Sequence, residues 1–113
     1  MPITNATLAA HQFLGPMYAD GYYPNELVDK VRAVLLELCE QVEASPSLSL
    51  DRLYALSHAA TERINEIAPE FEEHDSELET VAREAIAAEF GKIAECYGFA
   101  EADIEELISP RDW

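Results

Sequence analysis

Hydrophobic residues recur at intervals of three and four along most of this chain, which is the spacing of amphipathic helices. The longest such pattern lies between residues 76 and 97, where Ser76 and Glu79 have the spacing of a capping box. Gly98 follows at once and suits the left-handed residue that commonly closes a helix. We therefore expect a helix over residues 76–97. Its predicted apolar face consists of Leu78, Val81, Ala82, Ala85, Ile86, Ile93 and Cys96.

Two more long helices are predicted upstream. Pro24 suits the first position of a helix. The apolar stripe predicted after it consists of Leu27, Val31, Val34, Leu35, Leu38 and Val42, widened by Val28 and Cys39. Ser45-Pro46-Ser47 is a connection of the length that joins antiparallel helices. A third apolar stripe begins at Leu50 and must end or bend before Pro69, which lacks the backbone donor that a helix interior needs.

Shorter elements flank these helices. Residues 1–14 fit a short helix with Asn5 or Thr4 as its cap, and Gly15-Pro16 is expected to break it. Residues 101–108 fit a short closing helix, with acids in its first turn where the helix dipole favours them.

These elements predict an all-α protein, a compact antiparallel bundle of four to five helices. A chain of 113 residues has the usual size of a single domain, so we expect one domain over residues 1–113. Within it, residues 1–23 are predicted to be irregular or short-helical, residues 24–108 to form the bundle and residues 109–113 to be a tail. Trp113 is expected to fold back onto the body.

The charge balance narrows the classes of partner. The chain has 23 acidic and 7 basic residues, a formal charge of −16, and residues 66–79 hold seven acids without a Lys or Arg. Nucleic acids and anionic membranes are bound by clustered basic residues, so neither partner is expected. A basic protein partner is favoured instead, although a surface of this kind also serves solubility alone.

The two cysteines, Cys39 and Cys96, lie in apolar helical patterns without the close spacing of a zinc or redox motif. We interpret them as reduced core thiols of a cytoplasmic protein, and no signal peptide is expected. The chain also lacks a Gly-rich phosphate loop, a nucleophile elbow and a His-Glu-x-x-His motif. We therefore assign no catalytic residue, no metal site and no cofactor, and the interpretation leans away from an enzyme.

Glu89 is the one charge that looks misplaced. It projects only about 20° from Leu78 and Cys96 on a helical wheel, close to the middle of the predicted apolar face. A charge buried without a partner costs several kcal/mol, so Glu89 must be paired, protonated or partly exposed. A structural carboxylate and a functional carboxylate with a raised pKa are both consistent with this position.

A polar line follows one flank of the third helix. Tyr54, His58, Thr61 and Asn65 recur at intervals of four, three and four, beside the apolar stripe. These side chains would suit a small polar ligand or a peptide backbone, or they are boundary residues bonded to a neighbouring helix. If this flank meets Glu89, then His58 and Glu89 would make an acid and base pair.

Two further groups suggest contact surfaces. Tyr18, Tyr22 and Tyr23 either cover an edge of the core or line the lip of a binding site. Leu36 lies on the polar side of its helix, where it would contact the N-terminal segment or a second subunit of a homodimer.

Several strings of residues resemble those of a family of small acidic bacterial proteins catalogued as a domain of unknown function. The likeness covers roughly Met17 to Trp113 and leaves the first sixteen residues outside. It implies an all-helical cytoplasmic protein and supplies no site residue. The strings are Tyr22-Tyr23-Pro24, Leu27-Val28-Asp29-Lys30-Val31, His58-Ala59-Ala60-Thr61-Glu62, Glu79-Thr80-Val81-Ala82-Arg83-Glu84, Tyr97-Gly98-Phe99 and Arg111-Asp112-Trp113.

The leading functional hypothesis is a non-catalytic interaction module that binds a basic or polar protein partner. An immunity-like or antitoxin-like regulator is one form of it. The alternative is a small-ligand or enzymatic site built from Glu89 with His58, Tyr54, Thr61 and Asn65.

Overall fold

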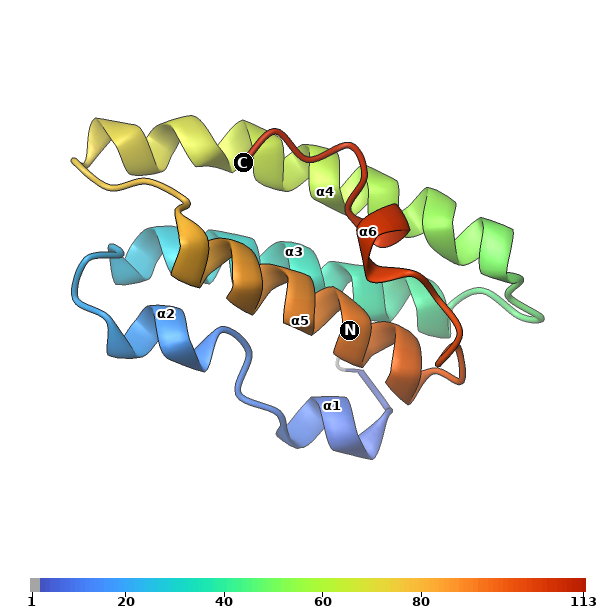
Figure 1. The fold of residues 1–113 in the computed structure, drawn as a ribbon. Coiled ribbons are helices and arrows are strands. Elements are labelled where there is room, and N and C mark those ends of the chain that lie inside the picture. The colour runs from blue at the N-terminus through green and yellow to red at the C-terminus, as the bar shows by residue number, and fades with distance from the viewer. Residues whose placement is uncertain (1–2) are drawn as a thin grey trace.

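The computed structural model describes residues 3–113, which contain six helices and no strand (Figure 1). The prediction of an all-α helical bundle is therefore confirmed. No helix in the described range is both long enough and apolar enough to cross a membrane. The helices are α1 (Ala6–Ala10), α2 (Gly15–Ala19), α3 (Asn25–Glu43), α4 (Leu50–Glu73), α5 (Thr80–Cys96) and α6 (Ile104–Leu107).

The three long helices form the frame. α3 and α4 make an antiparallel hairpin, and α5 then runs back in the direction of α3 (Figure 1). α5 contacts α1, α2 and α3, and on another side it contacts α6, which also packs against α4. The two ends of the chain are thus held by different surfaces, the N-terminal segment mainly by α5 and the C-terminal segment by α4 and α5.

The core runs through all of these helices and follows the predicted stripe of α3 closely. Alternation of three and four places one face of α3 against α4 and α5, so each apolar position on that face is removed from water. The buried residues of α3 are Leu27, Val28, Val31, Val34, Leu35, Leu38, Cys39 and Val42.

Two predicted helix ends are confirmed. The Asn5 side chain caps α1 by accepting a hydrogen bond of 3.1 Å from the Leu8 backbone N–H. At the end of α5, Gly98 has a φ of 90°. The backbone N–H of Phe99 bonds to the Ala94 carbonyl at 2.8 Å, which is the Schellman arrangement that a glycine at this position permits.

The predicted start of α5 is wrong. The helix begins at Thr80, and no side chain caps it, so the capping box of Ser76 and Glu79 is not formed. Ser76 is buried in the reversal after α4, where its backbone N–H bonds to the Phe71 carbonyl at 2.8 Å. Residues 74–79 form the turn between α4 and α5, so tertiary packing decides their conformation in place of the capping-box sequence.

The buried face of α5 also differs from the predicted face. Val81 was expected inside but is 45% exposed, whereas Phe90 is almost fully buried. Ala82, in the same first turn of α5, is fully buried, so this turn faces the core with Ala82 and leaves Val81 in contact with solvent.

Two prolines do not break helices as predicted. α4 continues to Glu73 and does not end before Pro69. A proline inside a helix costs about 3 kcal/mol, and full burial of a phenylalanine returns a comparable amount. Phe71 supplies that burial in the last turn and lies edge-to-face on Tyr23. Gly15-Pro16 starts α2 rather than breaking a helix, because a proline in the first turn removes no helical hydrogen bond.

Candidate functional site

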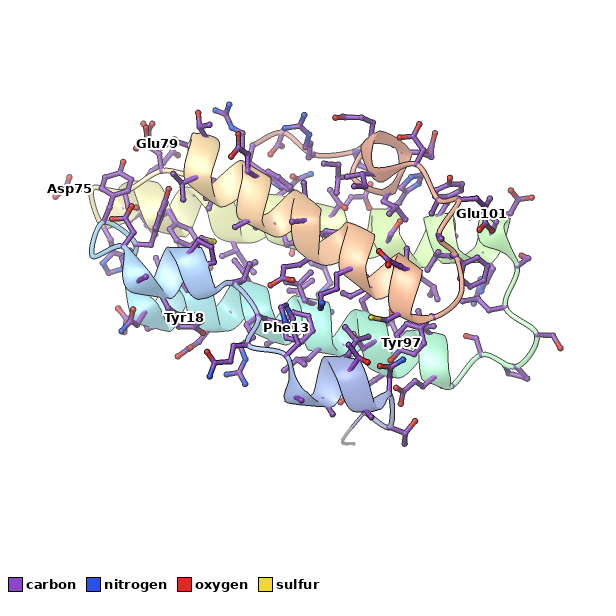
Figure 2. All side chains as sticks on the ribbon, turned by 60° about the horizontal axis from the view of Figure 1, so that its bottom comes forward. Phe13, Tyr18, Asp75, Glu79, Tyr97 and Glu101 are labelled. Atoms are coloured by element: carbon purple, nitrogen blue, oxygen red, sulfur yellow. The ribbon has the colours of Figure 1, made fainter. Side chains whose placement is uncertain are left out.

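Glu89 points into the molecule, as its position on the helical wheel predicts. The residue is only 6% exposed. Its Oε1 lies 2.7 Å from His11 Nε2, and its Oε2 accepts a hydrogen bond of 2.6 Å from the backbone N–H of Leu14. Both partners come from the connection between α1 and α2, next to Phe13 in Figure 2. The buried carboxylate is therefore paired, and it ties the N-terminal segment to α5.

Leu14 takes an unusual backbone conformation to reach this carboxylate. Its φ is 60° and its ψ is 32°, the left-handed region, which costs a residue with a Cβ roughly 1–2 kcal/mol. Its side chain is fully buried, and its N–H donates to Glu89. Strain of this kind persists only where surrounding contacts fix the backbone, so the α1–α2 connection is a rigid part of the fold.

The polar line on α4 holds the C-terminal segment. The Tyr54 hydroxyl accepts from the backbone N–H of Asp103 at 3.0 Å. His58 Nε2 lies 2.7 Å from the Glu106 carbonyl and 3.0 Å from Glu106 Oε2. α6 itself is a single turn over Ile104–Leu107, shorter than the predicted closing helix.

Further along α4, Thr61 and Asn65 continue this attachment. The buried Thr61 hydroxyl donates to its own helix at the Ser57 carbonyl, 2.8 Å away, with the Leu107 carbonyl at 3.3 Å. Asn65 Nδ2 donates to the Pro110 carbonyl, and Asn65 Oδ1 accepts from the backbone N–H of Asp112, both at 3.0 Å. The side chains of α4 thus bind a peptide backbone, and that backbone belongs to the same chain.

The structure brings these four α4 residues together but does not add Glu89 to them. Glu89 is bonded to His11 and Leu14, whereas His58 is bonded to Glu106 and lies 3.3 Å from the Ser109 hydroxyl. The hypothetical acid and base pair of His58 and Glu89 is therefore not formed.

A second carboxylate fastens the start of the chain. Glu43, at the end of α3, accepts hydrogen bonds from the backbone of Thr4 and Asn5 at 2.8–3.0 Å, and one from the Tyr97 hydroxyl. Burial alone would raise the pKa of Glu43, but these hydrogen bonds outweigh it and lower the pKa to about 2. Nearby, burial raises the pKa of Cys39 to about 12, so its thiol stays protonated and unreactive.

The three tyrosines do not form one lip. Tyr23 is buried against Phe71, and Tyr22 is exposed beside it. Tyr18 lies on α2, and its hydroxyl donates to Asp29 of α3.

The acidic run lies at one end of the bundle, where α4 passes into α5. Figure 2 shows Asp75 and Glu79 projecting from this end. Five carboxylates are exposed here, and none of them forms an ion pair with a Lys, Arg or His of residues 3–113. The five are Glu72, Glu73, Asp75, Glu77 and Glu79. We call this set the acidic end.

A groove of about 320 Å³ lies beside the acidic end. Its walls include Glu72 and Glu77 from that end, Asp112 and Trp113 from the C-terminal segment, and Arg83 from α5. Trp113 folds back onto the body, as predicted, and its buried Nε1 has no hydrogen-bond partner. The groove therefore combines carboxylates with an aromatic wall, and no cluster of His, Cys, Asp and Glu in the described chain would hold a metal ion.

A family model matches residues 7–113, nearly the whole chain. The chain belongs to DUF5713, a family of unknown function. No curated protein and no solved structure matches this DUF5713 chain. The resemblance noted in the sequence is thus confirmed, and the match begins at residue 7 rather than at Met17. It includes His11 and Leu14, the two partners of Glu89.

His11 is the residue of this DUF5713 protein that sequence reasoning missed. The predicted helix over residues 1–14 includes it, but α1 ends at Ala10, and His11 lies in the connection to α2, where helical spacing did not mark it as a site residue. One signal was available, because a buried carboxylate needs a donor and the chain has only three histidines, of which His74 is among exposed acids. Only the packing of α1 and α2 on α5 shows that His11, and not His58, is the partner of Glu89.

Proposed function

We propose that this DUF5713 protein is a non-catalytic interaction module whose acidic end binds a basic segment of a partner protein. The observation that carries the proposal is the group of five exposed carboxylates that form no ion pair within residues 3–113, beside a groove with an aromatic wall. Carboxylates in this state offer their full charge to a partner. An immunity-like or antitoxin-like role against a basic protein, in the cytoplasm, is the form that we favour.

The helix geometry adds to the negative field. Glu72 and Glu73 occupy the last turn of α4, which contains no basic residue. The C-terminus of a helix carries about half a negative charge, so acids at this position repel it. A basic segment docked there would relieve this repulsion, which favours the bound state over the free state.

The groove suits the side chain of an Arg or Lys from such a segment. Three carboxylates face it, against the one guanidinium of Arg83, whose Nε already donates to the Leu78 carbonyl. One face of the Trp113 ring already carries the Arg111 guanidinium, 5.6 Å from the ring centroid. The ring also lines the groove, and cations bind aromatic faces with about 0.5–2 kcal/mol. A cation entering the groove would thus meet both charge and an aromatic wall.

The alternative, a ligand site made by Glu89 with the four polar residues of α4, has less support. The polar atoms of Tyr54, His58 and Asn65 are already bonded to the C-terminal segment. Leu36 likewise packs on the core beside the N-terminal segment, which favours an internal role over a dimer contact.

The test uses Trp113, the only tryptophan of the chain, as a fluorescent reporter. An Arg- and Lys-rich peptide is titrated into the protein at increasing salt. We expect saturable binding that changes Trp113 fluorescence and weakens steeply with salt.

Two double variants of equal net charge distinguish binding at the acidic end from attraction by the net charge of the whole protein. Glu72→Gln with Glu77→Gln should weaken the peptide at least about tenfold. Glu84→Gln with Glu95→Gln changes two exposed acids of α5 and should have a small effect. An equal loss in both double variants would assign the binding to net charge, and the proposal would then fail. It would also fail if the peptide did not bind at low salt.

A further inference from the structure

A second groove lies between the N-terminal segment and α3, and His11, the partner of Glu89, is part of its wall. It consists of two adjoining hollows of about 530 Å³ and 240 Å³. His11, Phe13 and Arg32 line both of them. The larger hollow adds Tyr18; the smaller is mostly apolar, with Leu8 and Leu36, and its wall also includes Glu40. The groove thus has a polar half and an apolar half, with a guanidinium and an imidazole where they meet.

Arg32 supplies an anion-binding group. It is exposed and forms no ion pair with a carboxylate in the described chain, although the sequence has 23 acidic residues and only seven basic ones. It lies near the Tyr18 hydroxyl. A guanidinium presents a planar fork of donors that matches the two oxygens of a carboxylate.

His11 supplies a fixed acceptor. Its Nε2 lies 2.7 Å from the buried Glu89 carboxylate, and its ring packs edge-to-face on Phe13 at 4.7 Å between centroids. A carboxylate accepts, so Nε2 carries the proton; in the neutral form of the ring, which the site proposed below requires, Nδ1 is then an acceptor. No hydrogen bond occupies Nδ1 within residues 3–113. The strained backbone at Leu14 and the buried Glu89 hold this ring in place before any ligand arrives.

The three groups define the chemistry of a ligand. Arg32 can bind a carboxylate, and His11 Nδ1 can accept a hydrogen bond from a donor such as an ammonium group. The hollow beside Leu8 and Leu36 can accommodate an apolar side chain. A protein of formal charge −16 repels a net anion, whereas a zwitterion carries no net charge. We infer that this groove is a binding site for a free apolar α-amino acid.

The test is a titration of the full chain with L-leucine at about 150 mM salt, which screens the net charge beyond about 8 Å. Amide resonances of residues 11–15, 17 and 18 and of Arg32 should shift in a saturable way, while Trp113 fluorescence stays constant. Isocaproate lacks the ammonium group and isoamylamine lacks the carboxylate. Each should bind at least about tenfold more weakly, because each leaves one polar group of the site unpaired.

Arg32→Gln is the decisive variant, and Arg52→Gln is its matched control, an exposed arginine at the start of α4. Arg32→Gln should weaken L-leucine at least about tenfold, and Arg52→Gln should leave it unchanged. The inference is overturned if none of the three compounds shifts these resonances. It is also overturned if isocaproate binds as well as L-leucine, or if both arginine variants have the same effect.

Discussion

Replacement of Glu89 by glutamine probes the contact that joins the two halves of the fold. Glutamine has nearly the shape of glutamate, but it has one acceptor oxygen, whereas the carboxylate has two. Both carboxylate oxygens are in use, one by His11 and one by the Leu14 N–H. In Glu89→Gln, the amide oxygen can accept from the Leu14 N–H, and the amide NH₂ then faces His11 Nε2, which accepts it only after the ring proton moves to Nδ1. Both contacts therefore become hydrogen bonds between neutral groups, and the His11 tautomer must change.

The expected loss follows from burial. The Glu89 side chain is 8% exposed, and the His11 side chain is 24% exposed. A hydrogen bond to a charged group contributes about 1.5–3 kcal/mol, and little water reaches this pair to replace it. We expect Glu89→Gln to lower the free energy of unfolding by about 2–3 kcal/mol, a large part of the 5–15 kcal/mol typical of a domain. For a chain of this size, Tm should fall by about 8–12 °C.

Urea unfolding followed by circular dichroism gives the free energy, and hydrogen exchange at the Leu14 amide locates the loss. The amide should be protected in the native protein and exchange faster in Glu89→Gln, as the N-terminal segment loosens. Glu95→Gln is the control, because it removes the same charge from an exposed position on the same helix.

A different result would refute this reasoning. If Glu89→Gln were as stable as the native protein, or more stable, the carboxylate would cost more in desolvation than its two hydrogen bonds return. The same conclusion would follow if the Leu14 amide kept its protection.

Three further predictions concern the attachment of the C-terminal segment, the attachment of the N-terminal segment and the end of α5. Asn65→Ala removes two neutral hydrogen bonds to the C-terminal segment and should cost about 1–3 kcal/mol, with early proteolysis after residue 103; cleavage elsewhere first would contradict it. The lowered pKa of Glu43, about 2 against an ordinary 4.5, means that its stabilisation is present above pH 4.5 and is lost as the pH falls towards 2. The Thr4 amide resonance should therefore shift in that range, and in Glu43→Gln it should not. Gly98→Ala places a Cβ at a φ of 90° and should destabilise the protein by about 1 kcal/mol or more in urea unfolding, whereas an unchanged midpoint would remove the steric argument.

Periodicity predicted the long helices because burial of one face decides where they form. The stripe of α3 was correct residue by residue, and so were the inward direction of Glu89 and the glycine end of α5. Two of the errors fall at the α4–α5 reversal and at Pro69, where the tertiary position of Phe71 and Ser76 outweighs local preferences. Such positions depend on the assembled bundle and leave no local signal.

The site residues show the same division. The polar line on α4 was visible as spacing, but spacing carries no information about which segment it meets. The partners of Glu89 lie 75 and 78 positions away in sequence, in a connection that was predicted as the end of a short helix. Proximity across such separations is a property of topology, which one sequence read locally does not contain.

The way in which α4 grips the C-terminal segment also bears on how this family can diverge. Tyr54 and Asn65 bond to main-chain atoms, which every residue type carries apart from the proline nitrogen. Exposed positions such as Ser109 and Asp112 are therefore free to drift over evolutionary time without loosening the segment from α4. Selection for this attachment therefore acts on the side chains of α4. The C-terminal segment needs to preserve only its backbone path and the buried Leu107 and Ile108.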